Sequence, residues 1–368
     1  MSRRRWRLCR RRQRLVVRRA AVPPEAGRSR FGMERTELNK IARHLLETGR
    51  VEVVVGYRRG TEPLTATPAF VRDPEQAATL IFDATCGTNL ATYLPRLKGR
   101  KVAVVVKGCD ERSVIGLLQE QQAQREDLVL LGAPCPGVLD RKRLLQATGG
   151  QSPVDGRIDA EELVLRLPGA ELRLRLAEVM DVGCRVCAWR NPRLADYLIG
   201  DPVPTEERPD FDPEVAELEQ ATAETRWERF RQEMSKCILC FACRNLCPAC
   251  YCTECFADSS NPKWVGHTDD PADAMLFHLI RWTHLAGRCT GCGACVRGCP
   301  MGVNLRLYND KLRKEVKTAF QFEAGVDPAA KPPLVAALTD GEDFELLFTV
   351  AARDAVPLVD GWKKTFPE

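Results

Sequence analysis

Between residues 33 and 200, short runs of consecutive apolar residues alternate with segments whose apolar residues recur at helical spacing. The runs are rich in Val, Ile and Leu, and they predict strands at residues 51–55, 80–83, 101–106 and 128–131. Uninterrupted apolar runs of this length are typical of strands that are covered on both faces. The pattern therefore indicates a sheet buried between helices.

A βαβ unit is predicted inside this region. Apolar residues at helical spacing predict a helix over residues 113–124, between the strands at 101–106 and 128–131. A strand, a helix and a strand within about 30 residues indicate two parallel strands. We therefore expect residues 33–200 to form an α/β domain with a partly parallel sheet.

Other periodic segments complete the expected organisation. Charged and apolar residues alternate around Pro168-Gly169, which predicts a two-stranded hairpin over residues 161–167 and 171–176. Helices are predicted at residues 34–48, 214–234 and 305–320. The chain is expected to contain a basic tail (residues 1–32), the α/β domain (33–200), and a linker with a helix (201–235). An α+β two-cluster ferredoxin-like domain (236–305) and a helix with a C-terminal tail (306–368) are expected to follow.

Composition favours a folded protein without a membrane span. Hydrophobic residues make up 44% of the 368 residues, and no run approaches the roughly 18 apolar residues that cross a bilayer. Residues 1–30 hold twelve Arg and one Glu, which gives this segment a net charge of +11. Because the net charge of the whole chain is +5, the remaining residues carry an excess of negative charge. We expect this tail to be disordered or to precede a start at Met33; a nucleic-acid or membrane arm and a targeting peptide are the alternatives.

The seventeen cysteines carry the strongest chemical signal. Their spacings are those of metal sites, and no secretory signal is recognisable, which predicts a reducing cytoplasm. One pattern, C-x2-C-x2-C-x3-C-P, occurs twice, and its cysteines are Cys237, Cys240, Cys243 and Cys247, then Cys289, Cys292, Cys295 and Cys299. The duplication predicts two 4Fe–4S clusters.

The fourth cysteine of each run is expected to bind the cluster of the other run. This rule assigns one cluster to Cys237, Cys240, Cys243 and Cys299, and the second to Cys289, Cys292, Cys295 and Cys247. Zinc is the alternative, although zinc sites usually use two C-x2-C pairs. A separation of 42 positions between Cys247 and Cys289 shows that an insertion divides the two halves.

A third 4Fe–4S site is predicted in the α/β domain. Cys109 and Cys135 each follow one of the two parallel strands by three residues, and the carboxyl ends of parallel strands share one edge of a sheet. The C-x2-C pair Cys184 and Cys187 supplies two more thiols. Zinc at the same four ligands and unligated thiols are the alternatives.

The insertion adds three cysteines with no assigned partner. Cys250, Cys252 and Cys255 are either ligands of a further metal, completed by Cys86 or His267, or buried thiols that pack near the clusters.

Few other side chains are candidates for chemistry. His278 and His284 lie in an apolar helical stretch and are expected to be structural, and Trp264 and Trp282 to be core residues around the clusters. Asp110 and Arg112 closely follow Cys109. Either both hydrogen-bond a cluster or a bound cofactor, or Asp110 is a helix N-cap and Arg112 is a solvated side chain. The catalytic residues, if any, stay unknown.

Two segments of the α/β domain resemble the coenzyme F-420 hydrogenase/dehydrogenase beta subunits. Residues 107–112 resemble the family's Lys-x-Cys-Asp-x-Arg segment, and residues 184–200 resemble its Cys-x-x-Cys … Ala-Asp-x-x-x-Gly segment. With the duplicated motif, the chain is similar to the branch that carries a C-terminal dicluster and works with heterodisulfide-reductase-like complexes. The resemblance implies FAD, a 4Fe–4S cluster, and electron exchange between a deazaflavin and a hydrogenase, formate dehydrogenase or related partner.

The flavin site has no clear counterpart among the residues. No G-x-G-x-x-G follows a predicted strand, and residues 86–90 are a weak candidate for a phosphate or flavin loop, with an ordinary strand-to-helix turn as the alternative.

Three hypotheses of function follow. The first is an iron–sulfur electron-transfer subunit of an anaerobic oxidoreductase complex, with a redox protein as partner. The second is a flavin-dependent reductase of a deazaflavin or similar carrier. The third is a zinc scaffold that binds nucleic acid through the basic tail, which the acidic body and the motif spacing disfavour.

Overall fold

The computed structural model describes residues 35–159, 162–204, 211–268 and 270–329. The basic tail, the expected start at Met33 and the tail beyond residue 329 lie outside them. The described residues all fall within one compact unit, Met1–Ala330. The expected division into domains at residues 200 and 236 therefore stays a prediction.

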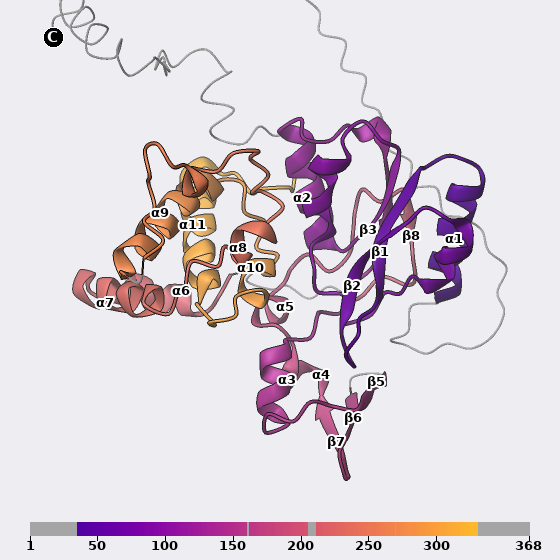
Figure 1. Ribbon diagram of the computed structural model, residues 1–368, viewed down its shortest axis with the longest axis horizontal. Coiled ribbons are helices and arrows are strands. Elements are labelled where there is room, and N and C mark those ends of the chain that lie inside the picture. Colours follow the sequence, from indigo (N-terminus) through magenta and orange to yellow (C-terminus); the bar gives the residue numbers. More distant parts are fainter. Residues whose placement is uncertain (1–34, 160–161, 205–210, 269, 330–368) are drawn as a thin grey trace, which may run out of the picture. The chain divides into compact units, whose positions relative to one another are not determined.

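The α/β region is built on a five-stranded sheet in the order β2-β1-β3-β4-β8. Its strands are β1 Val53–Arg59, β2 Ala66–Val71, β3 Val102–Val106, β4 Leu128–Gly132 and β8 Tyr197–Leu198. The pairs β1–β3, β3–β4 and β4–β8 are parallel, and β2 is an antiparallel edge strand. The expected partly parallel sheet is thereby confirmed. Figure 1 shows α1 (Arg35–Glu47) and α2 (Gly108–Gln119) on opposite sides of the sheet.

The predicted βαβ unit consists of β3, α2 and β4. Val102 pairs with Leu128 and Val106 with Gly132 in a parallel register, and every residue of both strands is buried. The helix begins at Gly108 rather than at residue 113, because the Asp110 carboxylate accepts a hydrogen bond from the Lys107 backbone N–H and starts the first turn directly after β3.

One predicted strand is absent, and three observed strands, β2, β5 (Asp155–Asp159) and β8, were not predicted. Residues 80–83 form a single bridge, between Ile81 and Tyr57, because β1 already pairs with β2 on one side and β3 on the other. The Asp83 side chain then accepts from the Thr85 backbone and turns the chain. Strand β2 contains Pro68, which hides it in the sequence but is tolerated at a sheet edge.

The predicted hairpin forms and gains a third strand. The antiparallel sheet joins β5 Asp155–Asp159, β6 Glu162–Leu167 and β7 Ala170–Arg175. Gly169 has a φ of 85° in the tight turn, a conformation that favours glycine. The helices α3 Arg141–Ala147, α4 Leu176–Val179 and α5 Val182–Arg185 flank this sheet in the sequence.

The dicluster region is helical. Its helices are α6 Glu214–Gln220, α7 Ala223–Met234, α8 Ala242–Asn245, α9 Pro271–Leu285, α10 Ala294–Arg297 and α11 Leu305–Phe320. Short 3-10 helices also occur along the chain, at Pro74–Thr79, Leu90–Leu97, Arg125–Asp127 and Phe256–Asp258. Residues 211–268 and 270–329 contain no strand, so the expected α+β fold is wrong for this part of the chain.

The insertion explains the helical fold. It forms α9, whose Trp282 packs with Phe230 of α7 and Tyr308 of α11. The helix expected over residues 214–234 is divided, because Thr222 is extended and caps α7 by accepting from the Thr225 backbone. Helix α11 covers residues 305–320 as predicted. Over the described ranges, no helix has the length and apolar character that a bilayer crossing requires.

Substitution of Gly108 tests the close packing between α2 and the segment after Cys187. An added Cβ would lie 2.2 Å from the Trp189 carbonyl oxygen, whereas at Gly116 of the same helix it would meet nothing within 4 Å. We expect Gly108→Ala to lower the free energy of unfolding by about 1–3 kcal/mol and Gly116→Ala to raise it by about 0.5–1 kcal/mol. Thermal denaturation followed by circular dichroism measures both, and equal effects would contradict the packing.

Candidate cluster-binding sites

The twelve predicted ligands line three cavities, four to each. The N-terminal site is lined by Cys109, Cys135, Cys184 and Cys187, the first dicluster site by Cys237, Cys240, Cys243 and Cys299, and the second dicluster site by Cys247, Cys289, Cys292 and Cys295. These are the groupings expected from the sequence, and the ligand role of each cysteine stays a prediction.

The duplicated motif adopts the same backbone twice. Leu239 and Phe241 have φ values of 53° and 55°, and the corresponding Gly291 and Gly293 have 69° and 72°. A left-handed conformation costs a non-glycine residue about 1–3 kcal/mol. The repeated conformation curls each loop so that its first three thiols face one cavity.

The fourth cysteine of each run crosses to the other cavity. Cys247 follows the short helix α8 and lines the second dicluster site, whereas Cys299 follows α10 and lines the first. Because α8 and α10 contact each other, the two dicluster sites are neighbours.

The sheet edge and α5 together build the N-terminal site. Cys109 lies in the first turn of α2, directly after β3, and Cys135 follows β4. The Cys135 backbone N–H donates to the Arg190 carbonyl over 2.8 Å, which ties the two segments together. Asp181 accepts from the Gly183 backbone over 2.7 Å and caps the helix that carries Cys184.

A buried cation lies beside the N-terminal site. The ammonium of Lys107, which is 2% exposed, donates to Asp110 over 2.7 Å, to the Tyr57 hydroxyl over 2.6 Å and to the Thr88 carbonyl over 3.0 Å. Burial is the largest single effect on the pKa of Lys107 and lowers it, but the charges of Asp110, Tyr57 and the nearby cysteines together outweigh burial, so the pKa is raised and the side chain stays charged. Lys107 thus adds positive charge to the wall of this cavity.

Arg297 of α10 links the N-terminal site to the dicluster sites. Its guanidinium forms an ion pair with Asp181 at 3.0 Å and donates to the carbonyls of Gly87 at 2.7 Å and Cys292 at 2.9 Å. Burial is the largest single effect on the pKa of Arg297 and lowers it, but the neighbouring charges, of which Asp181 is the strongest, together outweigh burial, so the pKa is raised. Cys292 lines both the N-terminal and the second dicluster cavity, so the N-terminal site adjoins the second dicluster site, which in turn neighbours the first.

Burial controls the state of the thiols. It raises the pKa of Cys135, Cys243 and Cys289 to about 11 each, because a thiolate loses its hydration inside the protein. A cationic metal centre reverses this preference and deprotonates its ligands. The cavities therefore suit a positively charged metal group.

A zinc ion is the alternative to a cluster at each of the three sites. Zinc holds its sulfur ligands at about 2.3 Å, which brings them close to one another. Among the described residues, no three His, Cys, Asp or Glu side chains converge on a point in this way. The choice between a cubane and a zinc ion at each set of four cysteines stays a prediction from the spacing of the motifs.

The extra cysteines of the insertion show no metal site within the described ranges either. Cys252 is exposed, and Cys250 and Cys255 are half-buried. Cys86 belongs to the core of the α/β region, whereas Cys250 and Cys255 pack against that of the dicluster region. The His267 ring lies 3.0 Å from the Ala257 carbonyl. The positions of Cys250 and Cys255 favour the expectation of packed thiols, whereas the exposed Cys252 does not fit it.

Two side chains outside the cysteine motifs contact predicted ligands. His278 Nε2 lies 3.4 Å from Cys237 Sγ, and Asn309 Nδ2 donates to Cys295 Sγ over 3.4 Å. Burial, and to a lesser degree the nearby Arg281, lower the pKa of His278 to about 3. The sequence marked His278 only as a polar residue in an apolar helix, and nothing in it singled out Asn309.

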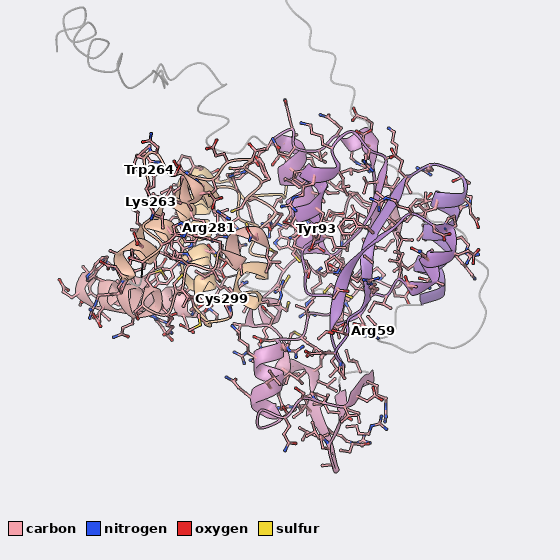
Figure 2. All side chains as sticks on the ribbon, viewed as in Figure 1. Arg59, Tyr93, Lys263, Trp264, Arg281 and Cys299 are labelled. Carbon is pink, nitrogen blue, oxygen red and sulfur yellow. The ribbon has the colours of Figure 1, made fainter. Side chains whose placement is uncertain are left out.

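Arg112 and Trp264 lie in environments that differ from those predicted from the sequence. Arg112 is buried, and it donates to the Thr290 carbonyl over 3.2 Å and to the Ala324 carbonyl over 2.8 Å, so it joins α2 to the dicluster region instead of being solvated. Trp264 is 54% exposed (Figure 2), and its predicted place in the core is wrong. Trp282 is buried as predicted.

The candidate flavin loop is engaged in internal contacts. Gly87 packs against Arg297, and the Thr88 carbonyl accepts from Lys107 and Tyr57. Asn89 caps the 3-10 helix Leu90–Leu97 by accepting from the Ala91 backbone. These contacts are typical of an ordinary turn, and flavin binding stays a prediction from resemblance.

Comparison with known proteins bears on this arrangement. Residues 233–303 match the 4Fe-4S dicluster domain family. The chain is 20% identical over 351 residues to the F420-dependent formate dehydrogenase subunit beta of Methanocaldococcus jannaschii, covering 79% of this chain and 91% of that protein. It is 23% identical over 354 residues to the F420-dependent formate dehydrogenase 1 subunit beta of Methanococcus maripaludis, with the same coverage.

A solved structure, the F420-reducing [NiFe] hydrogenase complex from Methanosarcina barkeri, shares 15% identity, with a TM-score of 0.34 over 45% of this chain and 66% of that one. The resemblance to the beta subunits that residues 107–112 and 184–200 indicated is confirmed by the two formate dehydrogenase relatives. The chain is an iron–sulfur electron-transfer protein, as the sequence predicted.

Loss of Arg297 is expected to destabilise the protein strongly. Arg297→Met leaves Asp181, whose side chain is 6% exposed, buried without its cation, and such a loss costs about 3–5 kcal/mol. The matched control is Arg166→Met, because the Arg166–Asp155 pair is 68% and 67% exposed and is worth about 0–1 kcal/mol. Thermal denaturation of anaerobically purified protein compares them, and similar melting temperatures would refute the buried link.

Proposed function

We propose that this chain, which resembles F-420-dependent beta subunits, carries three 4Fe–4S clusters and transfers electrons within an oxidoreductase complex. The observation that carries the proposal is the set of three neighbouring cavities, each lined by its own four predicted ligands, with Cys292 of the second dicluster site also lining the N-terminal site. The partner is proposed to be a formate dehydrogenase, hydrogenase or heterodisulfide-reductase-like subunit. The names of the two relatives support this class of partner.

The chain's own residues would position the clusters. When bound, a 4Fe–4S cluster takes up and releases one electron at a time at a potential that its surroundings set. Cys247 and Cys299, which cross between the runs, would hold the two dicluster sites side by side. Lys107 and Arg297 supply positive charge at the N-terminal site.

The first dicluster site has exposed residues in its wall. Cys240 is exposed, and the neighbouring Ile238 and Met301, which line the same cavity, are 61% and 47% exposed. We propose that electrons are exchanged with the partner protein here, whereas the N-terminal site serves the α/β region. A cytoplasmic location is supported by the absence of disulfide bonds among the described cysteines.

A flavin-dependent reductase remains the second candidate, and the F420-dependent activity in the names of the two relatives favours it. On this proposal FAD would bind the α/β region and pass electrons to the N-terminal site. The described residues name no flavin ligand.

Metal and cofactor analysis of the whole protein tests the proposal. We expect anaerobically purified chain to contain about twelve iron and twelve sulfide per molecule, from three clusters of four irons, and little zinc. Protein with zinc and no iron would refute it. Flavin released on denaturation decides between the two candidates.

Removal of the C-x2-C pair tests the third cluster. The double substitution Cys184→Ser and Cys187→Ser is expected to lower iron by about four atoms per chain, because it removes half of the ligands of one cluster. Cys252→Ser, at an exposed cysteine outside the three cavities, is the matched control and should leave iron unchanged. An unaltered iron content in the double variant would show that the N-terminal site holds no cluster.

A further inference from the structure

Each dicluster cavity has one side-chain N–H group aimed at one of its cysteine sulfur atoms. At the first site the group belongs to His278 of α9, 3.4 Å from Cys237 Sγ. At the second it belongs to Asn309 of α11, 3.4 Å from Cys295 Sγ. The two donors lie in different helices and contact different cavities.

Both side chains are buried, and the sulfur is the polar partner that each one has. His278 is 1% exposed and its ring packs on Phe277 and Trp282 at centroid distances of 4.9 and 5.5 Å. Asn309 is 5% exposed. Within the described part of the chain, His278 Nδ1 and Asn309 Oδ1 have no hydrogen-bond partner.

The unpartnered atoms fix how the donors are arranged. A neutral imidazole carries one N–H, and an unpaired buried N–H is costly. The tautomer with its proton on Nε2 places that N–H against the Cys237 sulfur. We assign this tautomer because Nδ1 has no hydrogen-bond partner among the described residues. Asn309 likewise keeps its amide nitrogen toward Cys295.

A hydrogen bond to a ligand sulfur changes the reduction potential. The reduced cluster carries one more negative charge than the oxidised one, so an N–H donor stabilises it more, and the potential rises. Both donors lie in the protein interior, where the low dielectric constant strengthens a hydrogen bond to sulfur.

We propose that His278 and Asn309 separately set the reduction potentials of the first and second dicluster sites, which rests on the clusters of the proposed function. They are positioning residues, since they act through Cys237 and Cys295. The chain then adjusts two neighbouring clusters with similar cysteine motifs independently, by one side chain from each of two helices.

The test is a redox titration of the whole protein monitored by electron paramagnetic resonance. His278→Phe and Asn309→Leu keep the shape of each side chain and remove its N–H. Each variant is expected to favour the oxidised form of one cluster about tenfold, which is about 59 mV lower for a one-electron couple. The two variants should move different reduction steps, so each is the control for the other.

Rescue separates hydrogen bonding from packing. His278→Gln retains an amide N–H and is expected to recover part of the potential, which His278→Phe cannot. The proposal is overturned if both clusters are present and neither step moves, or if both variants move the same step. Absence of any reducible signal in the unaltered protein would instead refute the proposed function.

A measurement on the unaltered protein covers the case in which a variant loses its clusters. Protein labelled with ¹⁵N-histidine should show weak nitrogen coupling to one reduced cluster in pulsed electron paramagnetic resonance. In the described ranges, no hydrogen bond joins His44, His267 or His284 to a cysteine; His267 Nε2 lies 3.0 Å from the Ala257 carbonyl, and the His284 ring packs against Phe256. A spectrum without this coupling would contradict the contact between His278 and Cys237.

Discussion

The buried guanidinium of Arg297 is the contact on which the arrangement of cysteines depends. It pairs with Asp181, which caps the helix that carries Cys184, and it also bonds the Cys292 carbonyl. One side chain therefore fixes a ligand segment of the α/β region against a ligand loop of the dicluster region.

Further polar contacts reinforce the same boundary. Arg112 bonds the carbonyls of Thr290 and Ala324, and Glu120 pairs with Arg288. These are buried or half-buried interactions between segments far apart in the sequence, and each satisfies a charge that would otherwise be costly to bury. The two regions accordingly pack through specific polar partners, which is suited to holding two metal sites at a fixed separation.

The sequence predicted what depends on local pattern. The duplicated spacing around Cys237 and Cys289 defined two ligand sets, and the parallel pair β3–β4 brought Cys109 and Cys135 to one sheet edge, as expected from their places after the strands. The prediction of a strand at residues 80–83 was wrong. This apolar run is buried beside β1, which already pairs with β2 and β3, so it forms only a single bridge. Pro68 concealed an edge strand whose tolerance of proline depends on topology.

The remaining features depend on contacts between distant segments. His278 and Asn309 reach their sulfur atoms only because α9 and α11 pack over the two loops, and no spacing in the sequence records that packing. Arg297 resembled an ordinary basic residue of the cysteine motif, and its ion pair with Asp181 spans 116 positions. The exposure of Trp264 and the helical form of the insertion likewise follow from tertiary packing.

The central claim is that the protein holds three neighbouring metal clusters. Cys292 lies in the wall between the N-terminal site and the second dicluster site. Diffraction data collected at the iron absorption edge from anaerobically grown crystals test the claim most directly. The account predicts three separate peaks of iron density, each surrounded by one of the four-cysteine sets, with the second dicluster site in the middle. Peaks that arise from zinc, or no iron among Cys109, Cys135, Cys184 and Cys187, would contradict it.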